Sequence, residues 1–133
     1  MAEKLMKLDV VTPQGVSLAQ DNVEAVYVET ISGSMGFLPD HTPLIAALKP
    51  HALRYSVAGT ETPLFVSGGL VEVFNNEVHV VAPAAEGKSE IDFARAQAAL
   101  DRALARLQSK ENIDEARAKA ALERAKARLS MRD

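Results

Sequence analysis

Residues 91–107 read IDFARAQAALDRALARL, and residues 113–129 read IDEARAKAALERAKARL. Thirteen of the seventeen positions are identical, at an offset of 22 residues. Neither segment contains glycine or proline, and the commonest residue in both is alanine, the best helix former. The five residues between them suit a connection between antiparallel helices. The repeat therefore predicts a helical hairpin, with helices at about 91–107 and 113–130.

Each predicted helix has an apolar stripe beside a ridge of arginines, on a wheel of about 100° per residue. The stripes are Phe93, Ala96, Leu100, Ala103, Leu104 and Leu107, and Ala118, Ala121, Leu122, Ala125 and Leu129. The ridges are Arg95, Arg102 and Arg106, and Arg117, Arg124 and Arg128. Because the second copy has Glu115 and Lys126 where the first has large apolar residues, we expect the second helix to be less buried.

A seam made mostly of alanine buries little apolar surface. Burial stabilises by roughly 25 cal/mol per Å², and short isolated helices are marginal in water. We therefore interpret the hairpin as a two-state element, docked or released, whose equilibrium a ligand can shift. The alternative is a permanently fixed hairpin.

The N-terminal part has the pattern of β-strands. Strands are predicted at residues 5–11, 23–28, 63–68, 70–74 and 77–81. Asn75 and Asn76 suit the positive φ angles of a two-residue hairpin turn. The predicted fold is an N-terminal antiparallel β-sandwich at 1–86, a hinge at 87–90 around Gly87, and a C-terminal antiparallel two-helix hairpin at 91–133.

Composition and charge limit the functional classes. Of the 133 residues 47% are apolar and 5% aromatic, which predicts an aliphatic core, and the absence of cysteine excludes disulfides. Without a stretch of roughly 18 apolar residues or a secretory signal, we expect a soluble, intracellular chain. Residues 1–88 carry −5 and residues 89–133 carry +2, which indicates an anionic ligand or acidic partner for the tail and is too weakly basic for nucleic acid.

No catalytic or metal-binding pattern occurs in the sequence. It contains no G-x-x-x-x-G-K-[ST], no H-E-x-x-H and no G-x-S-x-G. His79 lies in a predicted strand, where a structural or surface role is expected. We therefore expect no enzyme activity and no metal site.

Four segments carry the most distinctive motifs of the chain. They read LDVVTP at 8–13, GFLPDHTPL at 36–44, VSGGLVEV at 66–73 and APAAE at 82–86. In this order they resemble the epsilon family of F-type ATP synthases, over nearly the whole chain. Asp40 stands where the family usually has glycine, but aspartate tolerates a left-handed conformation. Ser34 stands where many members have glutamate.

The resemblance implies a non-catalytic rotor subunit of a proton- or sodium-translocating synthase, peripheral to the cytoplasmic face of the bacterial plasma membrane. The sandwich would dock on the gamma subunit and on the c-ring. The tail would fold on the sandwich or extend toward the alpha and beta subunits, where it restrains ATP hydrolysis. The docking residues it implies are Ser34, Met35, Gly36, Phe37, Leu38, Pro39 and His41.

Some members of the family bind ATP, with or without magnesium, in the compact form through a motif like [IL]-D-x-x-R-A. The matching residues here are Glu86, Ile91, Asp92, Arg95, Ala96, Arg102, Arg124 and Arg128. Arginines from two helices can converge on phosphates, and Asp92 can cap a helix. Because the motif recurs at 113–118, plain helix capping is an alternative interpretation. Two other functions stay open: a rotor subunit with an ATP-insensitive tail, and a stand-alone ligand-binding sandwich that dimerises through its helices.

Overall fold

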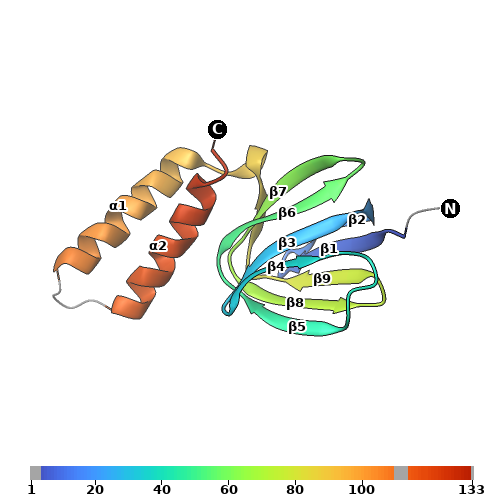
Figure 1. Cartoon of the computed structure of the whole chain (residues 1–133). Coiled ribbons are helices and arrows are strands. Elements are labelled where there is room, and N and C mark those ends of the chain that lie inside the picture. The colour runs from blue at the N-terminus through green and yellow to red at the C-terminus, as the bar shows by residue number, and fades with distance from the viewer. Residues whose placement is uncertain (1–3, 110–113, 133) are drawn as a thin grey trace.

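The computed structural model describes residues 4–109 and 114–132. A β-sandwich formed by the N-terminal part is followed by two antiparallel helices that project from one side of it (Figure 1). The strands are β1 Met6–Thr12, β2 Gly15–Val23, β3 Ala25–Thr30, β4 Gly33–Phe37, β5 Leu44–Leu48, β6 His51–Val57, β7 Thr60–Val66, β8 Gly69–Phe74, β9 Glu77–Val81 and β10 Ala85–Gly87. A 3₁₀ turn, η1 (Lys88–Glu90), leads into α1 (Phe93–Ser109) and α2 (Glu115–Leu129). The predicted fold class is confirmed.

The strands form one hydrogen-bonded sheet in the order β10-β7-β6-β3-β5-β8-β9-β1-β2, with β4 paired to β3. Neighbours pair antiparallel except β1 and β9, which pair parallel from Lys7–Glu77 to Val11–Val81. The turn between β8 and β9 has φ angles of 49° and 58° at Asn75 and Asn76, as predicted.

The core between the sheet layers is aliphatic, as the composition predicted. It consists of leucine, valine and methionine side chains with Ala82 and one aromatic ring, Phe37. A close approach of backbone explains Gly69, which has a φ of 109° and whose Cβ would collide with the Val81 carbonyl if it had one. The sandwich is therefore a well-packed platform for the surfaces described below.

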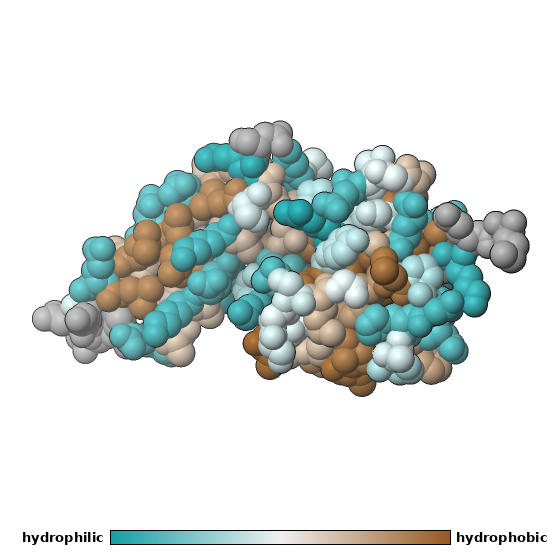
Figure 2. Space-filling view, in the orientation of Figure 1, coloured by the Kyte–Doolittle hydropathy of each residue, from teal (hydrophilic) through white to brown (hydrophobic). Residues whose placement is uncertain are grey.

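The two helices pack through alanine. The buried positions within α1 are Ala96 and Ala103, and within α2 they are Ala118, Ala125 and Ala127. The leucines of the predicted stripes are only half-buried or exposed, and apolar side chains remain uncovered along the hairpin (Figure 2). Leu104 is 41% exposed, so its predicted place in the seam is wrong. Neither described helix is long and apolar enough to cross a membrane.

The prediction that the second helix would be less buried is also wrong. In Figure 1, α2 lies between α1 and the sandwich, and it packs against β6. Ala127 and, just after the helix, Met131 are buried with Phe65 and Ile91 in a small cluster at this junction. The charged replacements Glu115 and Lys126 are exposed, so they do not oppose docking.

The predicted hinge at 87–90 falls on the end of β10 and on η1. Gly87 is extended, with a φ of −73°, a conformation open to any residue. Its amide donates to Glu90 Oε1 at 2.9 Å. The predicted connection at 108–112 lies partly outside the described residues.

A histidine side chain completes the sheet where the chain passes from β5 to β6. β3 pairs with β6 at Ala25–Tyr27 and with β5 at Thr30, and the ladder is interrupted between them. There the Glu29 amide donates to His51 Nε2 at 3.1 Å. Nδ1 of the same ring lies 2.6 Å from the Lys49 carbonyl, to which it must donate. The two bonds together require the neutral ring.

Burial lowers the pKa of His51, against smaller raising effects of the Lys49 carbonyl and the Glu29 charge. The unfolded chain therefore binds this proton more tightly than the folded one. We expect the free energy of unfolding to fall as the pH is lowered from 7.5 through the ordinary histidine value of 6.5.

Denaturant unfolding at a series of pH values measures this slope. In His51→Gln the slope between pH 7.5 and 5.5 should be smaller than in the wild type, by at most about 1.4 kcal/mol per pH unit for one group. Equal slopes in the wild type and His51→Gln would refute the assignment.

Candidate functional site

A pocket of about 420 Å³ lies where the hairpin meets β10 and η1. Seven of the eight predicted ATP-binding residues line it, together with Glu90 and three alanines. The seven are Glu86, Asp92, Arg95, Ala96, Arg102, Arg124 and Arg128. The fold thus brings together residues that are up to 42 positions apart in the sequence.

Ile91 is the exception among the predicted residues. Its side chain is buried in the junction cluster with Phe65, Ala127 and Met131, and it does not line the pocket. Its burial helps to hold the start of the hairpin against the sandwich, which is a structural role.

Asp92 caps the first helix. Its Oδ1 accepts a hydrogen bond from the Arg95 amide at 3.0 Å, and Asp114 accepts from the Arg117 amide at 3.1 Å in the same way. Capping is therefore common to both copies of the motif. The two copies differ in their position: Asp92 and Arg95 of the first copy line the pocket, whereas Asp114 and Arg117 of the second do not.

The pocket combines four arginines with three carboxylates. Among the described residues, the guanidinium groups of Arg95, Arg102 and Arg124 have no hydrogen-bond or ion-pair partner. Arg128 differs, because its Nε lies 2.6 Å from Glu86 Oε1 and its guanidinium lies over the Phe65 ring, 4.4 Å from the centroid. Three like charges left unpaired around one space favour an anionic ligand.

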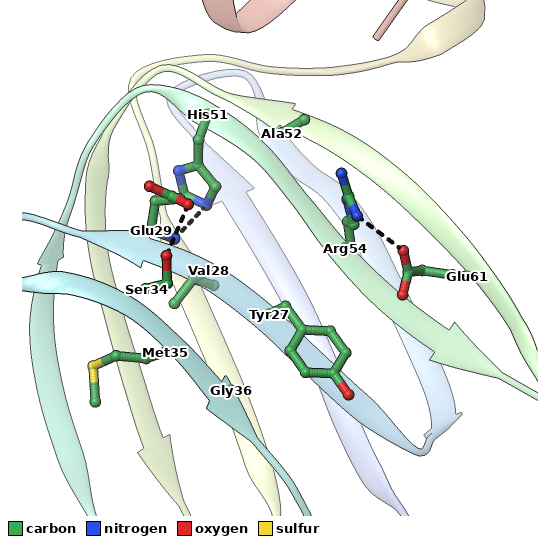
Figure 3. A pocket seen from close by; sticks show the side chains of 10 residues that line it. All are labelled: Tyr27, Val28, Glu29, Ser34, Met35, Gly36, His51, Ala52, Arg54 and Glu61. Atoms are coloured by element: carbon green, nitrogen blue, oxygen red, sulfur yellow. Dashed lines mark hydrogen bonds and ion pairs between the residues drawn. The ribbon is translucent and has the colours of Figure 1, made fainter. Parts of the chain in front are cut away.

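The predicted docking residues lie on β4 and in the turn that follows it. Ser34, Met35 and Gly36 line an open pocket of about 560 Å³ across β4, β3 and β6 (Figure 3). Ser34 Oγ donates to Glu29 Oε1 at 2.9 Å. The Tyr27 ring leaves little room beside Gly36, since a Cβ there would lie 3.1 Å from ring carbons.

Phe37 does not belong to this surface. Its side chain is fully buried in the core, so its prediction as a docking residue is wrong. Its ring meets that of His41 edge-on, with centroids 5.2 Å apart. Phe37 therefore anchors the turn that presents Leu38, Pro39 and His41, of which Leu38 is the most exposed at 56%.

The turn itself has the predicted backbone. Asp40 has a φ of 66°, so aspartate does occupy the left-handed position expected there. Its amide donates to Asn76 Oδ1 at 2.6 Å, and its carboxylate meets Lys4 Nζ at 3.2 Å. Hydrogen bonds from Lys4 and Asn76 lower the pKa of this carboxyl.

A row of exposed apolar side chains crosses the outer face of the sheet and escaped the sequence analysis. Val16, Val11, Val81 and Leu70 are successive cross-strand neighbours on β2, β1, β9 and β8. All four are at least 36% exposed, and Figure 2 shows hydrophobic side chains along the sandwich edge that holds β5 and β8. The sequence did contain a signal for this row, since residues 70–71 and 80–81 are consecutive apolar pairs. Successive residues of a strand point to opposite faces, and a strand that is apolar on both faces is expected to be covered on both.

Beside this row His79 and Asp9 are in hydrogen-bond contact, with Nδ1 and Oδ2 2.8 Å apart. Glu72 is the cross-strand neighbour of His79 on the other side. Within the part of the chain that the structure describes, no group of three or more histidine or acidic side chains could hold a metal ion. His79 is thus a surface residue paired with a carboxylate.

Comparisons with known proteins agree with this architecture. Residues 5–88 match the model of the ATP synthase delta/epsilon chain beta-sandwich domain, and residues 84–111 match that of its long alpha-helix domain. The ATP synthase epsilon chain of Desulforudis audaxviator is 48% identical over 107 residues, covering 80% of this chain and 77% of the relative. That of Carboxydothermus hydrogenoformans is also 48% identical over 107 residues, covering 80% and 78%.

Among solved structures, a chain in the Euglena gracilis mitochondrial ATP synthase assembly of OSCP, F1 and c-ring superposes with a TM-score of 0.83. It is 26% identical, and the match covers 95% of this chain and 79% of that one. Fold, sequence motifs and relatives thus agree. The chain belongs to the ATP synthase epsilon family, whose members are central-stalk subunits of F-type ATP synthase.

Proposed function

We propose that this non-catalytic subunit links the gamma subunit to the c-ring and regulates ATP hydrolysis through its hairpin, which binds ATP in the compact form. The observation that carries the regulatory part is the pocket between the hairpin, β10 and η1. There, arginines from both helices that have no partner among the described residues face one space. The subunit would act as a peripheral protein on the cytoplasmic face of the bacterial plasma membrane.

Two surfaces of the sandwich suit the two rotor partners. The apolar row Val16, Val11, Val81 and Leu70 is continuous, and such exposed patches mark protein interfaces. We assign it to the gamma subunit. The segment at 34–41 combines the polar side chains of Ser34, Asp40 and His41 with the apolar Met35, Leu38 and Pro39, and we assign it to the polar loops of the c-ring. Neither surface contains a residue of the hairpin. Rotation could therefore be transmitted with the tail in either form.

The chemistry of the pocket suits a nucleoside triphosphate that is bound without being hydrolysed. Arg102 of α1 and Arg124 of α2 face the same space and can donate charge-assisted hydrogen bonds to phosphate oxygens. Ala96, Ala99, Ala121 and Ala125 provide an apolar wall. The carboxylates limit the net positive charge and could contact the base or a magnesium ion that accompanies the phosphates.

Binding at this site would stabilise the compact form, because the pocket exists only while the helices are paired and docked. In the released form the half-buried leucines could pack on the alpha, beta and gamma subunits, with the arginine ridges facing acidic side chains. ATP would thus shift the equilibrium away from the inhibitory form by its preference for the compact one.

Calorimetric titration of the full chain with ATP, with and without Mg²⁺, tests the pocket. We expect Arg102→Gln to weaken binding by roughly tenfold or more, since a hydrogen bond to a charged group contributes about 1.5–3 kcal/mol. The matched variant Arg106→Gln lies one turn further along the same ridge, outside the pocket, and should bind as the wild type does.

Equal losses in both variants would indicate a general charge effect. The absence of heat in the wild type would favour the alternative of a rotor subunit whose tail does not respond to ATP.

Removal of residues 89–133 tests docking and regulation together. The apolar row and all ten strands precede this cut, so the truncated chain should still assemble with the gamma subunit and the c-ring. ATP hydrolysis by the whole enzyme should rise, because the inhibitory helices are gone. In the full chain, Leu70→Glu places a charge in the apolar row and should therefore impair assembly with the gamma subunit. Unchanged hydrolysis after truncation, in a fully assembled enzyme, would contradict the inhibitory role.

A further inference from the structure

One arginine of the hairpin is held between two side chains of the sandwich. Glu86 on β10 and Phe65 on β7 are direct cross-strand partners. Arg128, near the end of α2, places its Nε 2.6 Å from the Glu86 carboxylate and its guanidinium 4.4 Å from the Phe65 ring centroid. Carboxylate and ring therefore contact the same cation.

We infer that Phe65 and Glu86 form a socket for Arg128 that holds α2 on the sandwich before any nucleotide binds. Phe65 is then a positioning residue, because it acts on the ligand pocket through Arg128. The part of this inference that concerns ATP affinity rests on the proposed function, whereas the docking itself does not.

The surroundings of the socket make these contacts stronger than those of an exposed ion pair. The side chains of Arg128 and Glu86 are only 28% and 30% exposed, and Phe65 is fully buried. Partial removal from water strengthens both the charge-assisted hydrogen bond and the cation–π contact. Each element of the socket also has a fixed backbone, since β7 and β10 are paired over residues 64–66 and 85–87.

Little else fastens α2 to the sandwich. The apolar part of the junction consists of Ala127 and Met131 against Phe65 and Ile91, with Ala52 and Phe93 at its edge. Of the three buried alanines of α2, only Ala127 belongs to this junction, whereas Ala118 and Ala125 do not. Loss of the socket should therefore release the hairpin as a unit, with the helix pair itself intact.

The socket also divides the arginines of the pocket into two groups. Arg95, Arg102 and Arg124 have no partner among the described residues and are available to phosphates, whereas Arg128 is already paired. The first three are carried by the hairpin alone, and the fourth holds them beside Glu86 of the sandwich. The nucleotide pocket is complete only while the socket is occupied.

Site-specific replacement of Phe65 by phenylalanines with one, two and three ring fluorines tests the inference in the full chain. Fluorination withdraws charge from the ring face that attracts a cation and changes the size of the ring little. Because the chain has no cysteine, spin labels can be placed on cysteines introduced at exposed positions, Gln97 on α1 and Thr62 on β7. Distances between them report the docked fraction without ATP.

We expect the ratio of docked to released chains to fall stepwise with fluorination, by about fivefold or more at three fluorines. Glu86→Gln, which removes the charge and keeps the shape, should cause a similar loss. The control Glu115→Gln changes an exposed carboxylate at the end of α2 opposite to Arg128 and should leave the docked fraction unchanged.

An unchanged docked fraction in the trifluoro variant and in Glu86→Gln would overturn the inference, even if ATP affinity fell, because the two residues would then act only as ligands. Loss of docking in a chain that binds no ATP would support the socket and refute the proposed nucleotide site. Loss of docking in both variants, with a proportional loss of ATP affinity, would support both.

Discussion

The hairpin is held on the sandwich by a small contact, and its proposed behaviour depends on that fact. Every buried position within the two helices is alanine, whose methyl group buries little area. The leucines that could have formed a broad core are left half-buried or exposed. Only one end of α2 meets the sheet closely, through Ala127, Met131 and the Arg128 ion pair. Such an element can leave its platform without disturbing it.

The sandwich is built in the opposite way. Valine, leucine and methionine fill its interior, and the His51 ring accepts a hydrogen bond from β3 where its ladder is interrupted between β6 and β5. A rigid body with two outward surfaces and a loosely attached tail suits a rotor component, because torque would pass through the body while the proposed regulation would use the tail. The pocket lies at the boundary between the two, so a ligand bound there would favour the form in which they are in contact.

Sequence reasoning succeeded where the determinants are local. The repeat predicted both helices, and Asn75–Asn76 and Asp40 predicted left-handed turns, because these depend on backbone preferences of single residues. It failed where the answer depends on tertiary packing. The burial of Phe37, the placement of Ile91 under the hairpin and the position of α2 against the sheet follow from how the layers meet. The apolar row required the register of four strands, and the Phe65–Glu86 pair required the pairing of β7 with β10.

Native-state hydrogen exchange measures directly whether the hairpin opens separately from the sandwich. The amides of α1 and α2 should exchange through an opening of distinctly lower free energy than those of β1, β8 and β9. Saturating ATP should raise the protection of the helices and leave the strands unchanged. Helical and strand amides that exchange only through one common, global unfolding would contradict a tail that is docked by a small contact.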